Sequence, residues 1–266
     1  MLARKSATIA ACIQDTRIDD KPMTSTLQQQ AADLFNITLT DTQSAAFDTL
    51  AADLAEWNEK MNLTAITAPD DVRVRHFLDS LSIASVMELT DQQVIDIGTG
   101  AGFPGLPLAI AFPGLTVTLN EATGKKLKFI DHVVASLGLK NASTLHARAE
   151  EAGQQTRHRA KYDLVLARAV ARLPALLEYL LPLAKVGGTV IAMKGSTAFT
   201  EADDSGEALR VLGGELKDIL PIRLPEMDYD HQLIIVEKVK KTPGTYPRKP
   251  GTPTREPLME DEDDEF

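Results

Sequence analysis

Apolar and polar residues alternate along the chain with two different periods, and the period changes near residue 90. Before that point, apolar residues recur every three or four positions, which is typical of amphipathic helices. Helices are therefore expected at 26–35, 41–60 and 70–87. Thr40 and Gln43 match a capping box at the start of the second one. The first third of the chain is thus predicted to be helical.

From Val94 onward, short apolar runs alternate with helical stretches, and this alternation predicts a parallel sheet with helices on both faces. The expected strands lie at 93–97, 115–120, 142–146, 162–167 and 188–193, and the expected helices at 105–112, 124–137, 174–181 and 200–212. Two last apolar runs, 215–223 and 231–239, predict a closing antiparallel hairpin. The expected fold class is α/β, a doubly wound, mostly parallel sheet with a C-terminal antiparallel hairpin.

The two ends of the chain lack this patterning. Residues 1–24 are expected to be a disordered extension, and 241–266, with five prolines and six consecutive acids, a disordered tail. Between them, 25–240 are expected to form a single domain. It would consist of an N-terminal helical part, 25–90, and a Rossmann-like core, 91–240.

Composition narrows the class of protein only a little. Hydrophobic residues make up 44% of the 266 residues and charged residues 25%, as in ordinary soluble proteins. The lone Cys12 excludes an internal disulfide or a cysteine metal site, and no apolar run reaches the ~18 residues that span a bilayer. A cytoplasmic monomer without a metal or a membrane partner is expected. The formal charge of −10 does not exclude a nucleic-acid partner, because a basic patch can coexist with an acidic total.

The candidate chemistry begins where the first strand ends, in the turn Asp96-Ile-Gly-Thr-Gly-Ala-Gly102. A turn that lets a ligand approach the backbone needs residues without Cβ, and Gly98, Gly100 and Gly102 provide them. The helix after the turn would direct its free N–H groups towards the ligand. The pattern predicts a nucleotide-type cofactor site.

Two cofactors compete for this turn. Gly100-Ala-Gly-Phe-Pro-Gly105 also satisfies G-x-G-x-x-G, so an NAD(P)-dependent oxidoreductase remains an alternative. Pro104 removes a backbone donor where a pyrophosphate would need one. S-adenosylmethionine carries no phosphate, so the proline favours a methyl-donor site.

Residues after the next three strands complete the candidate site. Glu121 ends the second strand, about 20 residues beyond the glycines, where a carboxylate can accept both ribose hydroxyls. Ala149 and Glu150 come after the third strand and could read the adenine edge. Arg168 ends the fourth strand, at the edge of the sheet where open α/β folds bind ligands.

The residues after the fourth strand indicate the type of acceptor. Amino-methylating enzymes usually carry Asn/Asp-Pro-Pro-aromatic there, whereas this chain has Ala167-Arg-Ala-Val-Ala-Arg172. Methylation of pyrimidine C5 needs a cysteine nucleophile, and Cys12 lies far from the fold. Guanine N7 carries a lone pair and no proton, so it needs positioning but no general base.

Several motifs together resemble one family, the small-subunit rRNA guanine-N7 methyltransferases, also called RsmG or glucose-inhibited division protein B. The resemblance covers roughly residues 27–240. Its motifs stand here as Trp57-Asn-Glu-Lys-Met-Asn-Leu-Thr64, Arg75-His-Phe-Leu-Asp-Ser80, Asp96-Ile-Gly-Thr-Gly-Ala-Gly-Phe-Pro-Gly105, Gly124-Lys-Lys126, Leu166-Ala-Arg-Ala169 and Met193-Lys-Gly195.

The resemblance implies transfer of a methyl group from S-adenosylmethionine to N7 of one guanine in the decoding-region loop of 16S rRNA, guanine 527 in the standard rRNA numbering. It implies small-subunit rRNA, or the assembling subunit, as the partner. The implied cofactor contacts are Gly98, Phe103, Ala149, Glu150 and Arg168, with Glu121 in place of the usual ribose-binding acid.

Basic side chains are the candidates for holding the RNA. His76, Arg168 and Lys194 are expected to act at the target base. The further candidates for the phosphate backbone are Arg73, Arg75, Lys125, Lys126, Lys128 and Arg172. A non-catalytic ribosome-assembly factor would keep these basic positions without needing the glycines and Glu121, and it remains an alternative beside the oxidoreductase.

Overall fold

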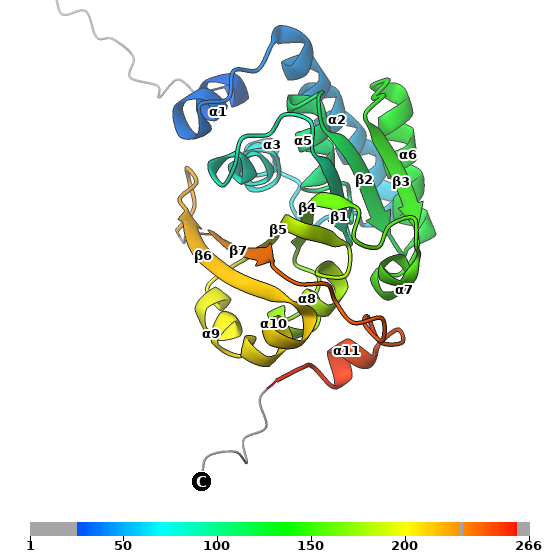
Figure 1. Cartoon of the computed structure of the whole chain (residues 1–266). Helices are drawn as coiled ribbons and strands as arrows, with labels where there is room; N and C mark the ends of the chain where they lie inside the picture. The colour runs from blue at the N-terminus through cyan, green and yellow to red at the C-terminus, as the bar shows by residue number, and fades with distance from the viewer. Residues whose placement is uncertain (1–25, 229–230, 260–266) are drawn as a thin grey trace, which may run out of the picture.

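The computed structural model describes residues 26–228 and 231–259. A seven-stranded sheet in the order β3-β2-β1-β4-β5-β7-β6 runs through the middle of the molecule (Figure 1). The strands are β1 (Gln93–Ile97), β2 (Thr116–Glu121), β3 (Ala142–His146), β4 (Tyr162–Arg168), β5 (Ala184–Lys194), β6 (Gly214–Ile222) and β7 (His231–Lys238). The first five are parallel, and β7 runs antiparallel to both of its neighbours. The predicted α/β fold class is confirmed.

Helices cover both faces of this sheet because its central strands bury side chains on both sides. In β4, Leu164 and Leu166 pack into one core, and Val165 and Ala167 into the other. The helices of the first core include α2 (Asp41–Met61), α5 (Gly105–Ala111) and α6 (Gly124–Ser136). Those of the second are α7 (Ala149–Gln154), α8 (Leu173–Leu180), α9 (Ala198–Asp203) and α10 (Gly206–Leu212). Packing on both faces thereby fixes the carboxyl ends of the parallel strands, where the sequence predicts the cofactor site.

The N-terminal helices pack on the first of these cores. They are α1 (Leu27–Phe35) and α2 (Asp41–Met61), and the expected capping box of Thr40 and Gln43 is present at the start of α2. The expected helix at 70–87 is instead four short pieces: α3 (Pro69–Val72), the π-helical turn η1 (Arg73–Leu78), α4 (Asp79–Leu81) and the 3₁₀ turn η2 (Ser82–Ser85). Such π turns are common at functional sites. Here the π turn carries His76.

The C-terminal region differs most from expectation. The prediction of disorder over 241–266 is wrong for 241–259, which come after β7 and include the short helix α11 (Thr252–Arg255). Prolines prevent this segment from pairing as a β-strand, but hydrogen bonds and ion pairs with other elements hold it in place. One of these is the ion pair between Arg248 and the fully buried Glu178. The extension at 1–24 and the acidic run at 260–265 lie outside the described residues.

Candidate functional site

The glycine turn between β1 and α5 has the shape that its glycines allow. Gly98, Gly100 and Gly102 have φ angles of 65°, 63° and 90°. This left-handed region disfavours residues with a Cβ. A Cβ on Gly98 would also lie 2.8 Å from Cγ2 of Val170, so Val170 packs this closely against the turn only because residue 98 has no side chain.

Asp96 holds the turn together from below. Its side chain is fully buried, and Oδ2 accepts hydrogen bonds from the Thr99 hydroxyl (2.5 Å) and the Gly105 amide (2.9 Å). Burial raises the pKa of Asp96 to about 7. The sequence placed Asp96 among the cofactor contacts, but the structure places it behind the turn, joining the two ends of the loop.

A cavity of about 270 Å³ opens beside this turn, at the carboxyl ends of β1, β2 and β3. Four of the predicted cofactor residues line it, namely Gly98, Glu121, Ala149 and Glu150. The other residues lining it are Ile97, Asn120, Ala122, Ala147, Arg148, Val170, Ala171, Tyr179 and Thr254. We call it the cofactor cavity.

Glu121 is fixed at the floor of the cofactor cavity. It is 6% exposed, Oε2 accepts from the Gly100 amide (3.1 Å), and Oε1 accepts from the Thr123 amide (2.7 Å). The neighbouring Asn120, which the sequence did not single out, donates to the carbonyls of Leu145 and Ala147 and so ties β2 to the end of β3. A preoriented carboxylate beside a glycine cradle fits the ribose of a nucleoside.

A second cavity, of about 460 Å³, lies on the other side of the end of β4, and we call it the acceptor cavity. Most of its lining residues are polar or charged, and a few are apolar: Ile66, Arg75, His76, Asp79, Arg168, Ala169, Met193, Lys194, Gly195, Thr197, Glu201 and His231. All three residues expected to act at the target base therefore line one cavity. The segment after β4 separates the cavities, because Arg168 and Ala169 line this one and Val170 and Ala171 line the other.

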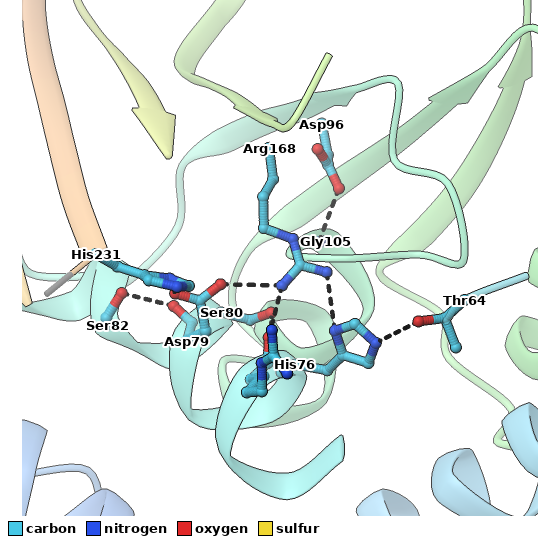
Figure 2. A network of polar contacts seen from close by, with 10 residues as sticks. Thr64, His76, Asp79, Ser80, Ser82, Asp96, Gly105, Arg168 and His231 are labelled. Atoms are coloured by element: carbon cyan, nitrogen blue, oxygen red, sulfur yellow. Dashed lines mark hydrogen bonds and ion pairs between the residues drawn. The ribbon is translucent and has the colours of Figure 1, made fainter. Parts of the chain in front are cut away.

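Arg168 is the centre of a polar network in the acceptor cavity (Figure 2). Its Nη1 donates to Oδ2 of Asp79 (2.9 Å) and to the Arg75 carbonyl (2.9 Å), and its Nη2 donates to Nδ1 of His76 (3.1 Å). Asp79 is fully buried, and its Oδ1 lies 2.7 Å from Nδ1 of His231. His231 was missed by the sequence, since it begins β7, 152 positions beyond Asp79.

His76 is held in its neutral form. Burial and the adjacent Arg168 guanidinium lower its pKa from 6.5 to about 4. Since Nδ1 accepts from Arg168, the ring proton lies on Nε2, which is 3.0 Å from the Thr64 hydroxyl. The ring stacks on Phe103 at 4.4 Å between centroids, and the Arg168 guanidinium lies 5.4 Å from the same Phe103 ring. Phe103 thus packs behind the acceptor cavity and does not line the cofactor cavity.

Lys194 is neutralised by a partner. Its Nζ lies 2.7 Å from Oε2 of Glu201 and donates to the Ala171 carbonyl (2.5 Å). Glu201 also accepts from the Leu173 amide (2.7 Å), so the pair fixes the turn after β4. The structure therefore supports a positioning role for Lys194, whereas the sequence expected it at the target base.

Within 26–228 and 231–259, no cluster of three or more His, Cys, Asp or Glu residues could hold a metal ion. In the same part of the chain, no helix is both long and apolar enough to cross a membrane.

Comparison with known proteins places this arrangement in a family. The family model described as rRNA small subunit methyltransferase G matches residues 43–226. The chain belongs to this family. A ribosomal RNA small subunit methyltransferase G of Acetivibrio thermocellus is 47% identical over 229 residues, covering 86% of this chain and 94% of that protein. Its counterpart in Alkaliphilus metalliredigens is 50% identical over 206 residues, covering 77% and 86% respectively.

Solved structures of low identity show the same fold. A SAM-dependent methyltransferase from Aquifex aeolicus superposes with a TM-score of 0.51 at 16% identity, covering 67% of this chain and 97% of that one. The resemblance to the rRNA small subunit methyltransferase G family, inferred from scattered motifs, is confirmed. Those motifs now lie together: the Arg75–Ser80, Leu166–Ala169 and Met193–Gly195 segments all contribute to the acceptor cavity.

Proposed function

We propose that this chain transfers a methyl group from S-adenosylmethionine to N7 of a guanine in small-subunit rRNA. The observation that carries the proposal is the pair of cavities that share the segment Arg168–Ala171 as their partition. One is built for a nucleoside and the other is lined by charged side chains. The names of the relatives, all small-subunit rRNA methyltransferases, support the choice of acceptor.

The residues of the cofactor cavity fit S-adenosylmethionine. Gly98 has no Cβ that would displace the Val170 side chain of the cavity lining, and Glu121 presents a fixed carboxylate for ribose hydroxyls. Two acidic residues, Glu121 and Glu150, and one basic residue, Arg148, line the cavity, and this net negative charge suits a cationic sulfonium better than a pyrophosphate. When bound, S-adenosylmethionine supplies an electrophilic methyl group.

The acceptor cavity is suited to positioning and not to proton abstraction. His76 is neutral, but both ring nitrogens are engaged, by Arg168 and by Thr64. Asp79 is buried and bonded to Arg168 and His231. Guanine N7 has no proton to lose, so an acceptor site without a free base matches it. Arginine planes commonly hold splayed RNA bases, which supports a position of the base beside Arg168.

The proposal is tested by mapping 7-methylguanine in 16S rRNA with borohydride reduction and aniline cleavage. Purified protein and S-adenosylmethionine are incubated with naked 16S rRNA or with small subunits from cells lacking the gene. Cleavage at one guanine of the decoding-region loop is expected, with guanine 527 as the specific candidate. Methylation at another atom or no methylation of either substrate would contradict it.

Arg168→Lys is the matched variant for this assay. A lysine keeps a positive charge for the buried Asp79 but cannot also bond to His76. Methyl transfer should fall strongly while the melting temperature changes little. Arg168→Ala is less informative, since an uncompensated buried carboxylate costs about 3–5 kcal/mol of folding free energy.

The two alternatives predict other outcomes. An NAD(P)-dependent oxidoreductase would be stabilised by NADH and not by S-adenosylhomocysteine, the reverse of what we expect. A non-catalytic assembly factor would bind rRNA without methylating it.

A further inference from the structure

Residues 242–256, which we call the C-terminal strap, run from the end of β7 back along α7 and α8 and end in α11 (Figure 1). The sequence predicted no structure for them. Their place beside the cofactor cavity raises the question of what they contribute to it.

The strap is anchored firmly. The Arg159 guanidinium donates to the carbonyls of Tyr246 (2.7 Å), Pro243 (2.9 Å) and Thr242 (3.0 Å). Nε2 of Gln154 donates to the Pro247 carbonyl (2.8 Å). Side chains that the core positions thus satisfy the backbone of a segment that has no ladder of its own.

A buried ion pair fixes the middle of the strap. Arg248 donates through both Nε and Nη2 to Glu178, whose side chain is fully buried in α8, and the Arg248 amide donates to the same carboxylate (2.6 Å). Three hydrogen bonds to one carboxylate leave little freedom of orientation. The residues that follow Arg248 in the strap are therefore held in a fixed position.

That place is the wall of the cofactor cavity. The Gly251 amide donates to Oε1 of Glu150 (2.8 Å), and the Thr254 hydroxyl lies 2.8 Å from the Tyr179 hydroxyl. Glu150 and Tyr179 are each 6% exposed and line the cavity, as Thr254 does. The strap contacts the end of the cavity next to the β3–α7 junction, and not the glycine turn.

We propose that Thr254 is a cofactor-contacting residue and that the strap forms the outer wall of the nucleoside end of the cofactor cavity. The assignment of the ligand rests on the proposed function. One carboxylate oxygen of Glu150 is bonded to the strap, and the other would accept from an exocyclic amino group of the ligand. The Thr254 hydroxyl, oriented by Tyr179, adds a second polar contact at the same edge.

The test measures binding by isothermal titration calorimetry, with two probes. S-adenosylhomocysteine carries both halves of the cofactor, whereas 5′-methylthioadenosine carries only the nucleoside half. Thr254→Val removes the hydroxyl and keeps the shape of the side chain. Thr254→Ser keeps the hydroxyl. Thr252→Val is the matched control, since Thr252 lies on the same helix but is not among the residues that line the cavity.

Thr254→Val should weaken both probes by about fivefold, the loss expected for one neutral hydrogen bond. Thr254→Ser and Thr252→Val should bind both within about twofold of wild type on the same scale. Melting temperatures without ligand should be alike, because Thr254 lies at the exposed rim of the cavity. Unchanged binding by Thr254→Val, or a loss confined to S-adenosylhomocysteine, would overturn the assignment. Failure of the wild-type protein to bind either probe would overturn the proposed function, and the role of Thr254 with it.

Discussion

At the scale of single residues, the buried carboxylates of the acceptor cavity are bonded to basic side chains. Asp79 is bonded to Arg168 and His231, and Lys194 is paired with Glu201. Removing one member of a buried pair leaves the other uncompensated, which costs more than the pair contributes. Substitutions here change folding as well as chemistry, so each needs a variant that keeps the charge balanced.

His76 makes the stability of the protein depend on pH. Its folded pKa of about 4 is below its usual 6.5, so between these values the unfolded chain binds a proton that the folded protein does not. Stability attributable to His76 is therefore full above about pH 6.5 and is lost as pH falls towards 4. Relative to His76→Gln, wild type should lose about 2 kcal/mol of unfolding free energy between about pH 7 and about pH 5. Urea denaturation of both proteins at the two pH values measures this, and parallel pH profiles would contradict it.

Gly98 and Gly100 form a matched pair for testing the glycine turn. Both have left-handed φ angles, so alanine at either position carries a similar backbone cost of about 1 kcal/mol. Only a Cβ at Gly98 meets Val170, at 2.8 Å, whereas the nearest atom to one at Gly100 is 3.9 Å away. Gly98→Ala should therefore weaken S-adenosylhomocysteine binding by more than about tenfold, and Gly100→Ala by much less.

The comparison of these two variants is made by calorimetry, together with the double variant Gly98→Ala, Val170→Ala. Shortening Val170 removes the clash and should restore part of the affinity. Equal losses in the two single variants would show that only the backbone conformation matters.

At the scale of elements, sequence periodicity predicted what local pattern determines. Buried parallel strands are short apolar runs, and the turns between them carry glycines, so β1 to β5 were found with their order of alternation. The π turn η1 was missed, because residues 73–78 fit helical spacing whether the hydrogen bonds are α or π. Helix α7 was also missed, because its six residues show no apolar periodicity. The ordered strap was missed because it is held by hydrogen bonds with Arg159 and Glu178, which are far from it in the sequence.

The candidate site was predictable to the same extent. Gly98, Glu121 and Glu150, predicted from the rule that ligands bind at the carboxyl ends of parallel strands, line one cavity. His231 and Thr254 reach the cavities from an antiparallel strand and from the strap, for which no local rule applies. Lys194 ends β5, as the sequence predicted, but its pairing with Glu201 depends on how α9 packs.

The strap provides the element-scale prediction. Arg248→Leu leaves the fully buried Glu178 without its countercharge and should lower the free energy of unfolding by about 3–5 kcal/mol. In the double variant Glu178→Gln, Arg248→Leu, the buried charge is removed. The amide oxygen of the glutamine can still accept a hydrogen bond from the backbone amide of residue 248. This double variant should recover at least half of the loss. Chemical denaturation of the three proteins measures both effects, and a double variant no more stable than Arg248→Leu would contradict the explanation.

At the scale of the whole molecule, the question is how a chain with a formal charge of −10 approaches RNA. The charges inside the acceptor cavity are largely balanced by their partners, so long-range attraction depends on the rest of the surface. Residues 260–265 carry six acids, and without them the formal charge is −4. Like charges on protein and RNA slow encounter, and salt screens the repulsion over about 10 Å at 0.1 M.

Deleting residues 260–266 should therefore raise the association rate with an rRNA substrate severalfold at low salt and leave kcat unchanged. The difference should shrink towards zero as salt approaches about 1 M, where screening acts over about 3 Å. A tail of the same length with the six acids replaced by their amides should behave like the deletion, because charge and not length is responsible. Stopped-flow binding of a labelled rRNA fragment at several salt concentrations measures this. A rate increase that persists at high salt, or one absent from the amide variant, would show that the acidic run acts by contact and not through its field.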